Sequence, residues 1–328
     1  AQARGKKVLL DFFTTPEYYE YALPSGVKTP HHWLINMAPK DNKRYAREFV
    51  VPMLKTLLQD LNLRAVRYFN PVNEPMEYGV FQTPGDNPPA ITAYVGLYRE
   101  IREALDEAGI TRERLGLVGM DTIEPLQQLL NMHAHKVDID PYIEAYSVHH
   151  YNLRLDHFPP KVTPDNPPDY FDSGIAGVIE REDREVLRYC RQLGKPLWAL
   201  EMGSFYNGKF ATPEGVSRFE TVLTVVEAMI RAANLGISTF CLWSLLNTDR
   251  VDGHWSVLRL EGNTWQGAGC AFDLYQMVGS HLRPEAMLAP LCPEPEVRPR
   301  HLHGSWASGP GPEETLFLVH DDLSEWRR

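Results

Sequence analysis

The sequence predicts an α/β fold of the (β/α)8 TIM-barrel type, incomplete at its amino-terminal end and followed by a C-terminal β-strand segment. Strand-length apolar runs alternate with amphipathic helical segments along most of the chain, as in parallel βα units. Two of these runs end in a carboxylate, Glu74 and Glu201. Barrels of this type hold their working residues at the carboxyl ends of the strands, so this pattern favours a barrel.

Composition bounds the class of protein. The chain has 328 residues and a net charge of −10 without a basic stripe, which suits one large domain and argues against nucleic acid as a partner. No apolar run reaches the roughly 18 residues of a membrane-spanning helix, so we expect a soluble protein. Residues 1–7 do not form a signal peptide, and the compartment, secreted or cytoplasmic, stays open. The four cysteines lack metal-ligand spacing and are expected to be buried thiols.

Six βα units are recognisable along the chain. Their strands are predicted to end near residues 13, 74, 121, 151, 201 and 243. The predicted helices span residues 43–61, 90–108, 123–133, 172–193, 213–234 and 272–281. Asp41 can cap the first helix, Pro52 predicts a kink or break inside it, and Gly109 ends the second.

The domain boundary is placed by a change in composition. Residues 1–290 are predicted as the barrel domain, and residues 291–328 as a Pro-rich linker and the start of a β-rich segment. The linker covers Pro293 to Pro312, and the segment from Glu314 to His320 is predicted as one more strand.

The two strand-ending glutamates are the candidate catalytic pair. Glu74 stands in Asn73-Glu74-Pro75, where Pro75 is expected to hold Glu74 in an extended conformation. Glu201 ends the run Leu197–Leu200, where desolvation disfavours its charge. The chain between them accommodates about three enlarged βα units of roughly 30 residues, so the two would face each other across one barrel mouth. Two facing carboxylates are the equipment for cleaving a glycosidic bond.

The segment Asn70-Pro-Val-Asn-Glu-Pro75, paired with Glu201, resembles clan A of the retaining glycoside hydrolases. The sequence of this segment is similar to that of family 30, with families 5 and 39 as near alternatives. The resemblance extends from about Val8 to Ala286. The resemblance implies a β-glycoside or oligosaccharide substrate, no cofactor and no metal. It also implies that Glu201 is the nucleophile and that Glu74, on the fourth strand, is the acid and base.

The resemblance extends to residues that would contact the sugar. It implies that Asn73 bonds the sugar 2-hydroxyl, that Tyr151 orients Glu201 and that Trp243 forms an aromatic floor; the alternative for Trp243 is a packed core residue. Alternation along the strand places His149 with Tyr151 in the pocket and His150 on the other side. Further candidates with an equally probable structural role are Asp121, which could instead cap a helix, and the loop aromatics Tyr18 and Trp33.

If Glu74 ends the fourth barrel strand, the strand at Val8–Phe13 is the third and two are missing. The clan places an Arg near the nucleophile on the second barrel strand, which is one of the two missing strands. An arc of six strands has two open edges, so we expect a homo-oligomer, most simply a dimer, that covers the open side. The alternative cover is the tail, Thr315–Val319, or the amino-terminal segment.

Two other functions stay open from the residues. One is a catalytically weak carbohydrate-binding protein, which keeps the cleft without the wall that bears the Arg. The other is a metal-dependent hydrolase on the same fold, with His149, His150, Asp121 and a Glu as ligands. The sugar, its linkage and the choice between exo and endo action cannot be read from the sequence.

Overall fold

The main sheet has six strands that follow one another in chain order. The structure, a computed structural model, describes residues 3, 5–12, 42–75, 89–151, 179, 183–203, 219–242, 258–261, 264–268, 270–281, 287–290, 302–308 and 314–320. The sheet order is β1-β2-β3-β4-β5-β6, where the strands are β1 (Val8–Asp11), β2 (Val66–Asn70), β3 (Gly116–Thr122), β4 (Ala145–Tyr151), β5 (Leu197–Gly203) and β6 (Phe240–Leu242). The pairs β1–β2, β2–β3, β3–β4 and β5–β6 are parallel. The predicted six-stranded, incomplete barrel is therefore confirmed.

The chain divides into two compact units. The first unit comprises Ala1–Val148 and Arg188–Trp198, and the second comprises His149–Leu187 and Ala199–Arg328. The boundaries fall within β4, within β5 and within the helix α6 (Arg184–Gln192).

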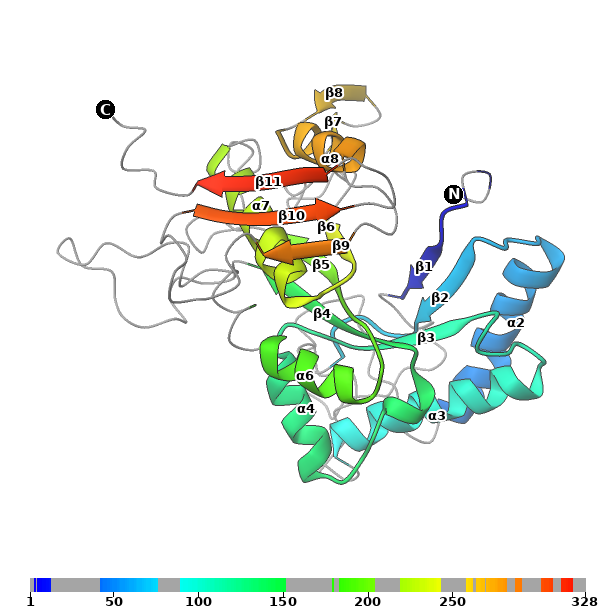
Figure 1. The fold of residues 1–328 in the computed structure, drawn as a ribbon. Coiled ribbons are helices and arrows are strands. Elements are labelled where there is room, and N and C mark those ends of the chain that lie inside the picture. The colour runs from blue at the N-terminus through cyan, green and yellow to red at the C-terminus, as the bar shows by residue number, and fades with distance from the viewer. Residues whose placement is uncertain are drawn as a thin grey trace, which may run out of the picture. The chain divides into compact units, whose positions relative to one another are not determined.

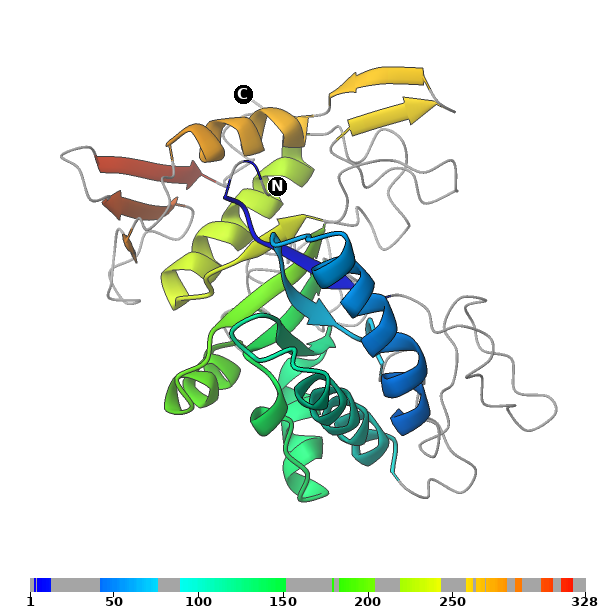
Figure 2. The ribbon, with the colours of Figure 1, turned by 90° about the vertical axis from the view of Figure 1, so that its right-hand side faces the viewer.

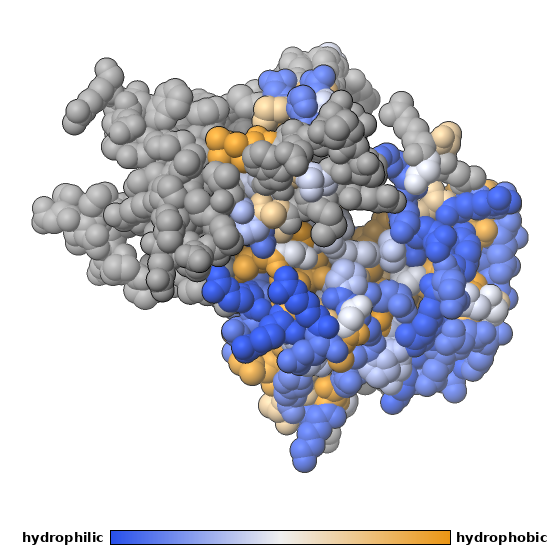
Figure 3. All heavy atoms as spheres, in the orientation of Figure 1, coloured by the Kyte–Doolittle hydropathy of each residue, from blue (hydrophilic) through white to orange (hydrophobic). Residues whose placement is uncertain are grey.

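The first unit packs helices on one face of its strands (Figure 1). Its helical segments are α1 (Asn42–Tyr45), η4 (Ala46–Val50), α2 (Val51–Lys55), η5 (Thr56–Asp60), α3 (Ala90–Glu107), α4 (Pro125–Ala134) and η7 (Asp140–Tyr142). The amphipathic helix α3 buries Tyr94 and Tyr98 completely, and Phe69 of β2 is equally buried. The outward surface of these helices is mostly hydrophilic (Figure 3), as expected for amphipathic helices on a barrel.

The first predicted helix continues through Pro52 instead of breaking. Residues flanking each segment keep right-handed helical angles from Tyr45 to Leu61. The segments η4 and η5 are π turns, in which Val51 N–H donates to the carbonyl of Ala46 and Leu61 N–H to that of Thr56. Because Pro52 has no N–H and stands in the first turn of α2, the wider turns absorb the missing bond.

The second unit contains helices and antiparallel strands that follow β5 (Figure 2). Its helices are α7 (Phe219–Leu235) and α8 (Cys270–His281). A hairpin pairs β7 (Leu258–Glu261) with β8 (Thr264–Ala268), and a three-stranded sheet has the order β11-β10-β9. Its strands are β9 (Met287–Pro290), β10 (Leu302–Ser308) and β11 (Glu314–His320), and this sheet packs against α7.

The C-terminal segment differs from the expectation. The strand Glu314–His320 is confirmed, but β10 lies inside the segment interpreted as a linker. Thr315 to Val319 pairs with β10, so the described part of the tail does not close the open side of the main sheet. The cysteine expectation is correct for Cys190, which is buried, and wrong for Cys241, which is exposed at the end of the sheet in β6. No helix within the described ranges is long and apolar enough to cross a membrane.

Candidate active site

Glu74 follows β2 in a tight, buried turn. Glu74 is 6% exposed and Asn73 is 2% exposed. The backbone of Phe12 holds the turn from both sides, because Phe12 N–H donates to the carbonyl of Asn70 at 3.2 Å and Asn73 N–H donates to the carbonyl of Phe12 at 2.9 Å. Glu74 has a φ of 41°, in the left-handed region.

The extended conformation expected for Glu74 is therefore wrong. The backbone of a residue that precedes proline prefers extended φ and ψ angles, and a left-handed φ costs a non-glycine residue on the order of 1–3 kcal/mol. The turn overrides this local preference because Phe12 anchors the backbone on both sides of Val72. Such strain in a buried carboxylate is typical of a functional site.

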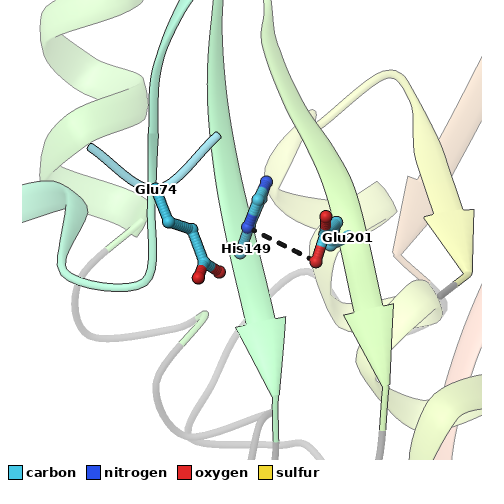
Figure 4. A group of neighbouring side chains, drawn as sticks. All are labelled: Glu74, His149 and Glu201. Carbon is cyan, nitrogen blue, oxygen red and sulfur yellow. Dashed lines mark ion pairs between the residues drawn. The ribbon is translucent and has the colours of Figure 1, made fainter. Parts of the chain in front are cut away.

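Glu201 and His149 face each other from neighbouring strands. His149 Nδ1 lies 3.6 Å from Glu201 Oε2, and the two side chains are 0% and 8% exposed (Figure 4). His149 belongs to β4 and Glu201 to β5, each near the carboxyl end of its strand. The imidazole can therefore fix the orientation of the carboxylate, and it would neutralise its charge when protonated.

Glu74, His149 and Glu201 form the group drawn in Figure 4. Each offers one ligand atom, these atoms all lie within 4.8 Å of one another, and all three side chains are buried. Two chemistries fit this grouping. A carboxylate pair can divide the roles of nucleophile and proton donor. The same nitrogen and oxygen atoms can also hold a metal ion such as Zn²⁺.

The neighbouring His150 has a separate partner, as strand alternation requires. His150 Nε2 lies 2.7 Å from Asp183 Oδ2, and both side chains are fully buried. The ligand set considered from the sequence for a metal hydrolase is therefore not the one that the structure groups. Within the described residues, only Glu74, His149 and Glu201 form a group of three candidate ligands.

Asp121 lies at the end of β3 and makes side-chain contacts within the first unit. It is 0% exposed, Asn70 Nδ2 donates to its Oδ2 at 2.7 Å, and Ser147 Oγ lies 3.1 Å from its Oδ1. The helix-capping alternative is wrong, because Glu124 N–H instead bonds Thr122 Oγ1 at 3.0 Å. Asn70 and Ser147 were not identified from the sequence. The signal for Asn70 was its place as the last residue of a buried strand.

Other residues predicted for the site lie outside the described part of the chain. These are Tyr18, Trp33 and Trp243, together with the side chain of Tyr151, whose backbone ends β4.

Comparison with solved structures shows the fold. A monomeric β-xylosidase from Caulobacter crescentus CB15 matches with a TM-score of 0.57 and 14% identity, over 95% of this chain and 60% of that one. A family 30 subfamily 8 xylanase from Clostridium acetobutylicum matches with a TM-score of 0.59 and 11% identity, over 97% of this chain and 65% of the xylanase. A family 51 arabinofuranosidase from Xanthomonas axonopodis pv. citri matches with a TM-score of 0.53 and 11% identity, over 88% of this chain and 59% of the arabinofuranosidase.

The chain thus has the barrel fold of glycoside hydrolases from families 30, 39 and 51. The resemblance to families 30 and 39 is confirmed at the level of the fold. The chain spans 60% and 65% of the length of the β-xylosidase and the family 30 xylanase. No family model and no curated protein matches the sequence.

Proposed function

We propose that the protein is a retaining β-glycosidase that hydrolyses β-linked glycosides or oligosaccharides with Glu201 and Glu74. The observation that carries the proposal is the grouping of these two buried carboxylates, with one oxygen of each within 4.8 Å of the other. Retaining enzymes place their carboxyl groups about 5–5.5 Å apart, whereas inverting enzymes need about 6.5–9.5 Å to admit a water molecule. The short separation supports retention.

The reaction proceeds in two displacements. Glu201 attacks the anomeric carbon and forms a glycosyl–enzyme ester while protonated Glu74 gives its proton to the departing glycosidic oxygen. Glu74, now a carboxylate, takes a proton from water, and the resulting hydroxide attacks the anomeric carbon and releases Glu201. His149 holds the Glu201 carboxylate in place for the attack, supported by the 3.6 Å separation between them.

The sugar is held by polar and aromatic groups in this proposal. Asn73 bonds the 2-hydroxyl, a bond that strengthens in the transition state, and Tyr151 orients Glu201. Trp243 forms the floor beneath the cleaved sugar, and Tyr18 and Trp33 complete the surroundings. The β-xylosidase and xylanase among the structures with this fold make β-xylosides the first substrates to try.

A panel of nitrophenyl β-glycosides tests the proposal. The wild type should hydrolyse at least one of them, and proton NMR should show the β-anomer as the first product. Glu201→Gln should abolish this turnover. Glu227→Gln is a matched control, because Glu227 is a buried carboxylate of α7 paired with Arg231 at 2.5 Å, and this variant should keep turnover. An α-anomer as first product would contradict retention, and an active Glu201→Gln would contradict the role of Glu201.

A metal-dependent hydrolase is the second candidate, and the same three side chains favour it as ligands. Metal analysis of the purified protein separates the two. The glycosidase proposal requires turnover that persists after EDTA treatment and dialysis. Loss of turnover on chelation, with recovery on adding Zn²⁺, would support the metal hydrolase instead.

A further inference from the structure

A chain of side-chain hydrogen bonds crosses four neighbouring strands of the first unit. Asn70 Nδ2 on β2 donates to Asp11 Oδ1 on β1 at 2.8 Å and to Asp121 Oδ2 on β3 at 2.7 Å. Ser147 Oγ on β4 reaches the other Asp121 oxygen at 3.1 Å. All of these side chains except that of Asp11 are fully buried. Asp11, Asn70 and Asp121 stand at or next to the carboxyl ends of their strands, and Ser147 is the third residue of β4.

We propose that Asn70 and Asp121 are positioning residues that hold the turn carrying Glu74 in its strained conformation. This inference rests on the proposed function, because it assigns Glu74 the role of acid and base. Neither residue needs to touch the substrate for it to hold.

Asn70 uses its whole amide in this arrangement. Its two N–H groups serve two different carboxylates, and its Oδ1 lies 2.9 Å from the hydroxyl of Tyr98. Burial, with smaller contributions from Tyr94, Asp121 and Asp11, raises the pKa of Tyr98 far above its usual value, so this hydroxyl stays a donor. Aspartate at position 70 would place a third carboxylate between two others, and leucine would donate no bond.

The same residue begins the strained turn. The carbonyl of Asn70 accepts from Phe12 N–H, and the next anchor is Asn73 N–H to the carbonyl of Phe12. Only three residues separate Asn70 from Glu74. A side chain clamped between β1 and β3 therefore fixes where the turn leaves β2, and with it the position of the Glu74 backbone.

Asp121 is itself held in an unusual backbone conformation. Met120 and Asp121 have φ of 74° and 52°, at a point where the β3–β4 register shifts. The hydroxyl of Tyr94 contacts both backbone groups of Met120, at 3.0 Å to N and 3.2 Å to O. Bulges of this kind re-aim a side chain. Here the bulge supports Asp121, which is bonded by Asn70 and Ser147.

A purely structural role would give a different result from a positioning role. Losing folded protein lowers the rate on every substrate equally. Misplacing Glu74 lowers it mainly for substrates with poor leaving groups, because only these need the proton. The ratio of kcat/KM for an activated dinitrophenyl glycoside to that for the alkyl glycoside of the same sugar therefore reports the position of Glu74 alone.

The test compares Asn70→Leu, Asp121→Leu and the conservative Asp121→Asn. The two leucine variants should raise this ratio by about 10–100-fold, the effect of a displacement on the order of 1 Å. Asp121→Asn keeps an acceptor for Asn70 and should stay within about 3-fold of wild type. Tyr189→Phe removes a hydrogen bond to Asp140 elsewhere in the first unit, at 2.8 Å, and as a control should leave the ratio unchanged.

A second readout does not need activity. Hydrogen exchange at the amides of Val72, Asn73 and Glu74 should accelerate at least about 10-fold in Asn70→Leu, because a loosened turn opens more often, and not in Tyr189→Phe. Unchanged exchange together with an unchanged ratio would overturn the positioning role. If Glu74→Ala itself leaves the ratio unchanged, the proposed function fails instead, and the exchange result alone decides whether Asn70 holds the turn.

Discussion

At the residue scale, neighbouring histidines on β4 have different partners. His149 faces Glu201 at 3.6 Å, whereas His150 faces Asp183 at 2.7 Å. Both are buried, so burial alone does not distinguish a site residue from a structural one. Alternation along the strand distinguishes the two histidines, because successive side chains point to opposite faces of a sheet.

This difference gives a paired prediction. His149→Gln should lower kcat about 10–100-fold with little change in the denaturant midpoint, because it loosens the nucleophile. His150→Gln should lower the free energy of unfolding by about 1–3 kcal/mol, because it weakens the pairing of a buried carboxylate, while the folded fraction keeps its kcat. Steady-state kinetics and urea unfolding of both variants provide the check. Reversed effects would exchange the roles of the two histidines.

Asp140, which is not one of the proposed site residues, gives a pH prediction. Burial raises the pKa of Asp140 above its usual 3.8, although a hydrogen bond from Tyr189 opposes the shift. The folded state therefore holds the proton more tightly than the unfolded chain, and the stability from this carboxyl, present at low pH, is lost as the pH rises through the raised pKa.

Asp140→Asn removes this titration. From about pH 4 to pH 7 the variant should gain stability relative to the wild type, measured as urea midpoints at a series of pH values. Parallel curves would show that Asp140 titrates alike in the folded and unfolded chains.

At the element scale, the strands of the barrel were predictable and the smaller strands were not. The run Leu197–Leu200 is apolar and is followed by the charged Glu201, which together predict a buried strand. The strand β5 begins at Leu197, as predicted, and continues to Gly203. The strands β7 to β10 are short or carry glycine and proline, and they are stabilised by pairing partners that no local pattern reveals.

The candidate site was predictable only in part, for a similar reason. Glu74, Glu201 and His149 stand at strand ends, which a local pattern can mark. The left-handed conformations of Glu74 and Asp121 depend on Phe12 and Tyr94, which are distant in sequence. The role of Asn70 likewise depends on three strands meeting, so only the folded structure reveals it.

The end of α3 offers a test of the left-handed backbone conformation assigned to Gly109. Gly109 has a φ of 74° just after the helix, and a Cβ there would meet no atom within 4 Å. Gly109→Ala should therefore lower the free energy of unfolding by about 1 kcal/mol through conformation alone. The control is Gly279→Ala in α8, where a Cβ also meets nothing and alanine should stabilise by up to about 1 kcal/mol. Equal effects in urea unfolding would contradict the reading of Gly109.

At the scale of the whole molecule, the main sheet ends in β1 on one edge and β6 on the other. No strand in the described part of the chain pairs with the outer edge of either. Unpaired strand edges are templates for association, and a closed eight-stranded barrel would have none. The amino-terminal strand β1 is half-buried along its length, and the residues of the apolar strand β6 are half-buried or exposed.

We therefore predict that the purified chain self-associates, most simply as a symmetric dimer that covers the open edge. Sedimentation velocity over a dilution series should show a dimer at micromolar concentrations that dissociates on dilution. A monomer at every concentration would contradict this prediction, and would leave the edges to be covered within one chain.

The central claim is that Glu201 forms the glycosyl–enzyme and that Glu74 is needed to release it. The most direct measurement is intact mass and peptide mapping of Glu74→Ala during turnover of a dinitrophenyl β-glycoside. Without its base this variant should accumulate one sugar on the peptide that contains Glu201, and added azide should release it as a glycosyl azide. An active Glu74→Ala variant with no adduct, or with an adduct on another residue, would contradict the account.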